Sequence, residues 1–422
     1  MAPKIVIKNI GPIKEANLDL NKINVFMGPQ SSGKSTIAKL ISYCTWVEKD
    51  VATSQSLEAY QKDKNYFADC LENFHRLSGY FKHPNRYISY ESDVIAVEYS
   101  AGNFSVRWKD RYAYKRSKIS YIPSERNMVI LPDVRKVEFG NSNIRSFLFD
   151  WFDARKSYSK TKKMSILNLG IDYYYNENSD EDHILSPSGD YYDIALSNAS
   201  SGLQSITPLF IILDYLTSLF YKGKENISFV LNERRNQTDW ILMEELVLKK
   251  YFDGNRKNIK DEVAEINEKL SAKDEQVGKL VAEWDKIMEN LFSTHNAQFI
   301  IEEPGQNLFP ETQRDLVYHL LSKCVNSEHR LTITTHSPYI LYALNNCMLG
   351  GLVGDKMKNA DKEKVKCKAS FINPQNVSVY EIHDGALKPI QQDDGLISAN
   401  YFDAEMKKLM DDFYVMLNYY GV

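Results

Sequence analysis

A glycine-rich segment near the start of the chain carries the spacing of a phosphate-binding loop. Residues 28–35 read Gly-Pro-Gln-Ser-Ser-Gly-Lys-Ser and match the pattern G-x-x-x-x-G-K-[ST] in full. In this pattern backbone N–H groups cradle phosphate, the following helix adds the positive end of its dipole, and the lysine reaches the terminal phosphates. The expected phosphate-binding residues are Gly28, Gln30, Ser31, Ser32, Gly33, Lys34, Ser35 and Thr36. We expect the Lys34 side chain to face solvent while the loop is empty.

Two carboxylates follow an apolar run and are the next candidates for chemistry. Glu302 and Glu303 come directly after Phe299-Ile300-Ile301. At a strand tip beside a phosphate loop, the first carboxylate can hold the shell of a Mg²⁺ ion, together with the Ser35 hydroxyl. The second can orient and deprotonate the attacking water. Paired acids at a strand end are more often solvated charges, and the phosphate loop is what favours the catalytic interpretation.

A histidine occupies the end of the next β-rich run, in Thr334-Thr335-His336-Ser337-Pro338. A lone histidine at such a position is more often structural. Because the run follows the acidic strand along the chain, the imidazole is expected near the same edge, where it could reach the γ-phosphate. His336 and Glu303 are therefore the predicted catalytic residues.

The hydrophobic pattern predicts the elements that must position these groups. A buried strand is expected directly before the glycine-rich loop and a helix directly after it. Alternation over residues 86–109, with a Gly-Asn turn, predicts antiparallel strands. The expected strands are 23–27, 118–122, 298–301 and 330–334, and the expected helices are 34–46, 203–221, 311–324, 338–347 and 401–420.

A charged stretch of about seventy residues precedes the acidic strand. Apolar residues recur in it on alternating steps of four and three, and only Lys273 interrupts the stripe. The stripe residues are Ile259, Val263, Ile266, Leu270, Val277, Leu280, Trp284, Ile287 and Leu291. One continuous helix is possible, but Ser271-Ala272-Lys273-Asp274 resembles a capping box and favours a broken helix or hairpin. The stripe is expected either on the surface of its own domain or in an intermolecular coiled coil.

Composition limits the class of protein. The chain has 422 residues, of which 43% are hydrophobic and 26% charged, with a net charge of −4. It can bury a sizeable core, and it lacks the globally basic surface of a nucleic-acid coat protein. The longest apolar stretch, 206–221, is too short to span a bilayer, and the five cysteines are scattered. We therefore expect a cytoplasmic protein with no membrane partner.

Together these motifs resemble the heads of SMC-type proteins with an ATP-binding cassette (ABC), in particular the OLD-like group of bacterial ATPases that often serve in antiphage defence. Residues 5–36 look like the opening of that family, and 121–126 look like its central IPxER element. Ser200-Ser201-Gly202-Leu203-Gln204 resembles its signature loop. The resemblance implies an α/β fold of the ABC head type, with a mixed central sheet flanked by helices, an antiparallel β subdomain and a helical insertion.

The resemblance also implies a domain division and an activity. The head would comprise residues 1–221 and 293–422, and residues 222–292 would form the insertion. In the family ATP lies between two heads, and the signature serine and glycine contact the γ-phosphate from the opposite subunit. Carried over, these residues are Ser200 and Gly202, with Ser201 as a register alternative. The implied protein hydrolyses ATP with Mg²⁺ as a homodimer or higher homo-oligomer.

The implied role is that of a sensor or regulatory subunit in an antiphage system with a separately encoded effector, a nuclease or a toxin. The alternatives are an SMC-like DNA-binding ATPase in repair or tethering, and an ATP-locked scaffold with little turnover. The loop 305–310 departs from the family pattern, so slow hydrolysis is expected. Gln30 stands where the family usually has asparagine.

Three further patterns carry weaker signals. The residues after His336 hold no Asp-x-Asp, which argues against a C-terminal Toprim nuclease. Arg314 and His319 match a loose ribonuclease spacing but are expected at ordinary surface positions. Basic and aromatic residues interleave over 107–116, and a second basic cluster covers 155–163. Each suits nucleic-acid contacts, although a solvated sheet edge is the more common explanation for the first.

Overall fold

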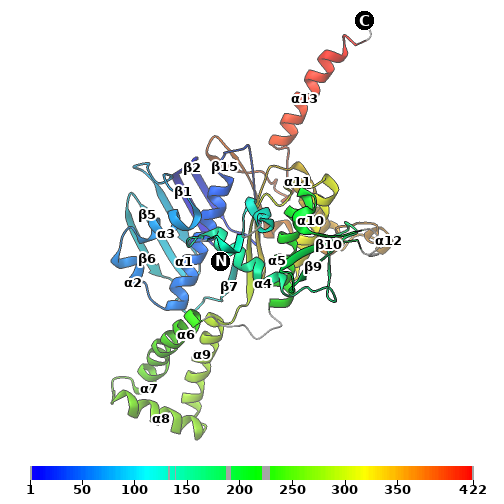
Figure 1. Cartoon of the computed structure of the whole chain (residues 1–422). Coiled ribbons are helices and arrows are strands. Elements are labelled where there is room, and N and C mark those ends of the chain that lie inside the picture. The colour runs from blue at the N-terminus through cyan, green and yellow to red at the C-terminus, as the bar shows by residue number, and fades with distance from the viewer. Residues whose placement is uncertain (1, 132–133, 138, 187–191, 221–228, 421–422) are drawn as a thin grey trace.

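The structure, a computed structural model, describes residues 2–131, 134–137, 139–186, 192–220 and 229–420. Its largest element is an 11-stranded mixed sheet with the order β6-β5-β4-β1-β2-β15-β14-β3-β13-β12-β7 (Figure 1). The strands are β1 (Lys4–Ile10), β2 (Ile13–Asp19), β3 (Ile23–Met27), β4 (Tyr87–Glu91), β5 (Ile95–Ser100), β6 (Asn103–Trp108), β7 (Ser117–Ile122), β12 (Asn296–Glu302), β13 (Arg330–Thr335), β14 (Val377–His383) and β15 (Ala386–Pro389).

The sheet has two halves of different character. Strands β14, β3, β13, β12 and β7 pair in parallel, so that their carboxyl ends share one edge. Strands β6, β5, β4, β1 and β2 form antiparallel ladders. A second, four-stranded antiparallel sheet contains β8 (Met164–Ser165), β9 (Asp172–Asn176), β10 (Glu181–Leu185) and β11 (Asp193–Ala195). The expected α/β class with a mixed central sheet and an antiparallel part is confirmed.

Helices cover both faces of the parallel half. The helices of the main body are α1 (Lys34–Ser54), α2 (Glu58–Lys62), α3 (Tyr66–His75), α4 (Asn143–Arg155), α5 (Ser201–Asp214), α10 (Pro310–Val325), α11 (Pro338–Val353) and α12 (Asn359–Lys362). Strand β3 shows how they divide the core, because Ile23, Val25 and Met27 join the cluster that contains α4, α5, α10 and α11. Phe26 points the other way and joins the cluster that contains α1. This alternation is what a strand buried on both faces requires.

Residues 229–292 form a separate group of helices that extends from one end of the molecule (Figure 1). It contains α6 (Phe229–Leu242), a π-helical turn, α7 (Lys249–Phe252), α8 (Ile259–Ser271) and α9 (Glu275–Phe292). The helix break at 272–274 confirms the broken form, but Asp274, not Ser271, caps α9, accepting from the N–H groups of Gln276 and Val277. Most of the stripe packs inside the chain, with Ile266 and Val277 buried, whereas Ile259 and Leu270 are exposed. The boundaries of head and insertion stay a prediction.

Two helices differ from their expected extent or setting. Helix α1 continues to Ser54, well past residue 46, because Val47, Val51 and Ala52 remain buried against the core. Residues 201–219 form a helix long and apolar enough to cross a membrane by length and composition, with 56% of it buried inside the structure. Helix α13 (Tyr401–Leu417) leaves the body at the end opposite to α6–α9 (Figure 1).

Candidate functional site

The glycine-rich loop joins β3 to α1 and has the shape of a phosphate cradle. Gly33 precedes the first turn of α1 at φ 106°, and no side chain caps the helix, so its first N–H groups stay available to an anion. A Cβ on Gly28 would lie 2.4 Å from the carbonyl oxygen of Ile382, so only glycine fits there. The Ser32 hydroxyl is buried with no hydrogen-bond partner. An uncapped helix end, a close-packed glycine and an orphaned hydroxyl fit a phosphate ligand.

Lys34 does not face solvent, and that expectation is wrong. The side chain is buried, and its ammonium donates to the carbonyl oxygens of Gly28, at 2.9 Å, and Pro29, at 2.8 Å. The carbonyls of its own loop surround the cation, because a buried ammonium needs acceptors. Burial lowers the pKa of Lys34 to about 8, and the nearby Glu303 carboxylate partly opposes that shift.

His336 and Glu303 meet Lys34 at the shared edge of the parallel strands, as the sequence predicts for groups at these strand ends. The His336 backbone N–H donates to Glu303 Oε2 at 2.9 Å, and His336 Nε2 lies 3.3 Å from Glu303 Oε1. His336 Nδ1 lies 3.2 Å from the Lys34 ammonium. Lysine can only donate and would leave Nδ1 as the acceptor, whereas the Gly28 carbonyl oxygen, 3.1 Å from the same Nδ1, can only accept and would need a proton there. The two contacts therefore favour different protonation states of the His336 ring.

Burial sets the charges of this cluster. Desolvation raises the pKa of Glu303 to about 7, and the hydrogen bond from the His336 N–H and the charge of Lys34 oppose the rise. Desolvation, and then the charge of Lys34, lower the pKa of His336, while a hydrogen bond to the Gly28 carbonyl opposes that shift. A carboxyl with a pKa near neutrality is suited to exchange protons with water.

Glu302 lies on the α1 side of the sheet and is buried. Its carboxylate accepts a hydrogen bond from the Tyr121 hydroxyl on β7. Ser35 stands in the first turn of α1. Within the described ranges no hydrogen bond joins Ser35 to Glu302, so their shared role as Mg²⁺ ligands stays a prediction that the hard oxygen chemistry of the two side chains fits.

Arg126 is a positioning residue to which the sequence assigns no role, beyond its place in the IPxER resemblance. It is fully buried and donates to the carbonyl oxygens of Ser205 at 2.9 Å, Glu302 at 2.8 Å and Glu303 at 2.7 Å. Burial lowers its pKa to about 10. The guanidinium ties the acidic end of β12 to α5, the helix that begins at the signature loop. The arginine of the IPxER element was the sequence feature that could have identified this role.

The signature loop opens α5 and stands at the surface. Ser200 is the N-cap and accepts from the Leu203 N–H, and both Ser200 and Ser201 are exposed. A Cβ on Gly202 would lie 2.9 Å from the carbonyl oxygen of Asn307, so this glycine lets the 305–310 loop approach. Within the described ranges no hydrogen bond joins Ser200–Gly202 to Lys34, Glu303 or His336 of the same chain. Their contact with nucleotide stays a prediction.

Three arginines of the basic stretches are engaged inside the molecule, whereas most of the other basic residues there are exposed. Arg111 pairs with Glu245 of the insertion at 2.6 Å and lies over the Trp108 ring, while Arg116 donates to Thr294. Arg155 is buried and pairs with Asp180 and Asp182. These contacts are structural.

The Arg314–His319 pair also proves structural. Arg314 pairs with Glu311 and Asp315. His319 is wrongly expected at the surface, since its ring packs 4.5 Å from that of Phe210 and burial lowers its pKa to about 4.

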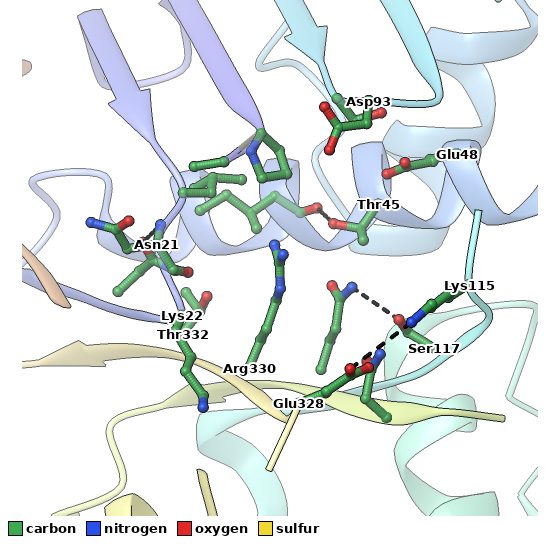
Figure 2. A pocket seen from close by; sticks show the side chains of 18 of the residues that line it. Asn21, Lys22, Thr45, Glu48, Asp93, Lys115, Ser117, Glu328, Arg330 and Thr332 are labelled. Atoms are coloured by element: carbon green, nitrogen blue, oxygen red, sulfur yellow. Dashed lines mark hydrogen bonds and ion pairs between the residues drawn. The ribbon is translucent and has the colours of Figure 1, made fainter. Parts of the chain in front are cut away.

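A cavity of about 700 Å³ opens at the opposite edge of the sheet, where the parallel strands begin (Figure 2). Figure 2 shows Arg330 reaching into it from β13, with Glu48 and Thr45 of α1 on the far wall. Lys22 and Arg330 precede or open strands whose carboxyl ends carry the phosphate loop and His336. The cavity and the phosphate cradle are therefore separate sites.

Comparison with known proteins gives the following matches. Residues 4–278 match the AAA_23 family, an AAA domain, and no curated protein matches the chain. The SMC head domain from Thermotoga maritima is 11% identical, with a TM-score of 0.38 over 93% of this chain and 100% of that chain. The Pyrococcus furiosus Smc head bound to a ScpA domain is 9% identical, with a TM-score of 0.36 over 97% and 99%. A nucleotide-free ATP-binding cassette from an ABC transporter is 11% identical, with a TM-score of 0.26 over 100% of both chains.

The family match spans well over half of the chain and includes β3, the glycine-rich loop and α1. The mixed sheet continues beyond it and brings the ends of β12 and β13 beside that loop. The chain belongs to the AAA domain family, and its fold is a mixed central sheet flanked by helices.

Proposed function

We propose that the chain binds ATP at residues 28–36 and hydrolyses it with Glu303 as the general base. One observation carries this proposal, which is the connected cluster of Lys34, His336 and Glu303 at the edge where the phosphate cradle opens. The N–H groups at the start of α1 and the Lys34 ammonium would bind the phosphates. In doing so Lys34 would exchange the carbonyls of Gly28 and Pro29 for phosphate oxygens.

The protonation states of the cluster suit hydrolysis. Ionised Glu303 can take the proton of the attacking water, and the backbone N–H of His336, which donates to Glu303 Oε2 at 2.9 Å, can hold the carboxylate in place. His336 is also within reach of Lys34, so it can follow the terminal phosphate that Lys34 binds. Ser35 and Glu302 would hold Mg²⁺, which when bound neutralises charge on the phosphates.

The proposed assembly is a homodimer with ATP between two heads. The support is the exposure of Ser200 and Ser201, since no hydrogen bond joins them to a nucleotide-site residue of the same chain in the described ranges. A loop that caps the phosphate of a second copy must be exposed in the isolated chain. When Ser200 and Ser201 bind the second copy, the 305–310 loop would move with them, because Gly202 is in contact with Asn307 of that loop.

Mixing two inactive variants tests this composite site. Glu303→Gln removes the base and should lower turnover by ~10²–10⁴-fold while ATP stays bound. Ser200→Arg should obstruct closure while each chain still binds ATP. Mixed dimers then carry one site with both lesions and one with neither, so phosphate release should return as the two variants are mixed. Full subunit exchange without any recovered turnover would contradict independent sites that act in trans.

The proposed role is a sensor or regulatory subunit in antiphage defence with a separate effector. It rests on the OLD-like resemblance of residues 5–36, 121–126 and 200–204. The internal ion pairs of Arg111 and Arg155 weigh against the alternative of a DNA-tethering ATPase, because those cations are already paired. Phage challenge of cells that carry the gene with its neighbours tests the role. Protection should be lost in Lys34→Ala, and equal plaque counts with and without the intact gene cluster would contradict it.

The second alternative is an ATP-locked scaffold, and the unusual 305–310 loop favours it. In that loop the Gln306 side-chain oxygen is buried without a hydrogen-bond partner. Tight ATP binding with no phosphate release by the unaltered protein would establish this alternative over the hydrolysing enzyme.

A further inference from the structure

Helix α13 exposes a long apolar surface at the end of the chain. It leaves the body as an isolated rod (Figure 1), and no residue of it is buried. Met406, Leu409, Phe413 and Met416 are 61%, 66%, 52% and 64% exposed. Tyr420, just beyond the helix, is 86% exposed. Single exposed apolar residues are ordinary, but a contiguous surface of this kind marks an interaction site.

The base of α13 is held firmly, so the rod has a defined direction. Asn400 and Asp403 form a reciprocal capping box at its start. The Tyr401 N–H donates to Glu381 on β14 at 3.2 Å, and the Tyr342 hydroxyl on α11 donates to Asp403 at 2.8 Å. Both contacts lie at the carboxyl edge of the sheet. His383, next to that base, lines the same small hollow as Gln30, Ser31 and Ser32 of the phosphate loop. The rod therefore grows from the nucleotide edge of the head.

The apolar residues have the period of a paired helix. Phe402, Met406, Leu409, Phe413 and Met416 follow one another at steps of four, three, four and three. This spacing gives a seam for a partner helix with the same period. The seam holds no charge, and Lys407 and Lys408 fall outside it. Tyr414 and Val415 also lie outside it.

Charge decides the direction of a pair of such helices. In a parallel pair, the flanking Glu405 and Asp412 face the apolar Met410 and Leu417 of the other copy. In an antiparallel pair aligned about Leu409, the centre of the helix, Glu405 of each copy lies beside Asp412 of the other, which is unfavourable. A parallel pair also keeps both heads at the same end of the rod.

The exposed area is enough for a stable pair. The seam residues Met406, Leu409, Phe413 and Met416, with the flanking Met410 and Leu417, are six exposed apolar side chains, which at about 100 Å² each make roughly 600 Å² per chain available. Two copies would bury up to about 1,200 Å², which is the lower end of a standard specific interface of ~1,200–2,000 Å².

We propose that α13 pairs with α13 of a second copy of this chain as a parallel two-stranded coiled coil that joins two heads before nucleotide binds. That the joined heads then close on ATP rests on the proposed function, whereas the pairing does not. The paired helices would hold the two heads near each other, which raises their effective concentration and favours their closure on ATP.

Light scattering of the nucleotide-free protein tests the pairing. The unaltered chain should have the mass of two chains, and Leu409→Glu with Phe413→Glu should halve that mass. Lys407→Gln with Lys408→Gln changes the net charge by the same amount outside the seam and should leave the dimer intact. A monomeric unaltered chain at tens of micromolar, or a dimer that survives the double glutamate change, would overturn the proposal. So would an equal loss of dimer in the control.

A cysteine placed in the seam tests the direction and does not depend on how well the double variant folds. In a parallel pair two copies of residue 406 lie opposite each other, within the ~4.4–6.8 Å between Cα atoms that a disulfide needs. Met406→Cys should form a covalent dimer under mild oxidation, and Lys408→Cys should not. Equal cross-linking of both variants, or of neither, would overturn the parallel pair. Lys34→Ala should still pair, so loss of nucleotide binding and loss of pairing are separable results.

Discussion

At the scale of single residues, the site is a balance of buried charges. Lys34 and Glu303 have pKa values moved toward each other by desolvation, to about 8 and about 7. His336 lies between them and is favoured in its neutral form. Such a cluster is costly to keep without a ligand, which is typical of a site prepared for an anion.

Lys34→Ala should abolish measurable ATP binding, because it removes the cation that the terminal phosphates need. The chain should remain folded, although the carbonyls of Gly28 and Pro29 lose their donor and stability should fall by about 1–2 kcal/mol. Calorimetry with ATP and circular dichroism measure the two effects. Lys8→Ala on β1, which removes an exposed ion pair with Glu15, is the control. Equal ATP affinity in Lys34→Ala would refute the phosphate-loop assignment.

Glu303→Gln should stabilise the nucleotide-free chain at pH 8 and not at pH 4. The pKa of Glu303 is near 7 when folded and 4.5 when unfolded, so ionisation costs the folded state nothing below pH 4.5 and its full amount above pH 7. The difference corresponds to roughly 1–3 kcal/mol in urea unfolding. Glu125→Gln is the opposite control, because an Arg76 partner lowers the pKa of Glu125. That variant should lose stability at pH 8.

At the scale of elements, Arg126 couples strand β12 to helix α5. Its guanidinium joins β12, through the carbonyls of Glu302 and Glu303, to α5, through that of Ser205. The end of β12 needs this support because Glu303 adopts a left-handed φ of 44°, which is strained for a glutamate. If bound ATP shifted β12 or α5, the shared hydrogen bonds of Arg126 would shift the other element as well.

Arg126→Lys should therefore lower turnover more than ATP binding. A lysine keeps the charge but cannot reach three carbonyls in the arginine geometry, so Glu303 would lose its fixed orientation. We expect phosphate release to fall by ~10²-fold, while ATP affinity changes little because Lys34 is untouched. The measurement is the separation of kcat from KM and from calorimetric affinity. A proportional fall of both would make Arg126 a purely structural residue.

At the scale of the whole molecule, two projections extend from opposite ends of the head. Helices α6–α9 extend from one end and α13 from the other (Figure 1). The insertion is tied to the head by the pairs Arg234–Asp50 and Arg111–Glu245, at 2.6 Å each. Helix α13 begins beside the phosphate loop. The two proposed contacts between chains, one through nucleotide and one through α13, would therefore be separable by mutation.

These two modes of joining should separate in one combined variant. Glu303→Gln traps ATP and should hold heads closed, even when Leu409→Glu and Phe413→Glu remove the α13 seam. The triple variant should be monomeric without nucleotide and dimeric with saturating ATP and Mg²⁺, at a higher protein concentration than Glu303→Gln alone requires. Sedimentation over a concentration series measures this shift. A triple variant that stays monomeric with ATP would show that α13 is required for head closure.

The local parts of this fold and site are readable from the sequence. The strand 23–27, the glycine-rich loop and the start of α1 follow from a short apolar run, turn-forming glycines and a helical period, all of which act between near neighbours. The meeting of Glu303 and His336 also follows, because parallel strands bring their carboxyl ends to one edge. The exposed seam of α13 has the same kind of local period.

Long-range contacts decided the rest. Lys34 is buried because the carbonyls of its own loop and His336, 302 residues away, close around it. His319 is only partly exposed because Phe210 of α5 packs against its ring, and Arg126 finds its acceptors on β12 and α5, which lie far along the chain. Most of the stripe in 259–291 packs within the molecule because α9 lies against the π-helical turn 243–248. Periodicity reports which face of an element is apolar, but the partner of that face depends on tertiary packing.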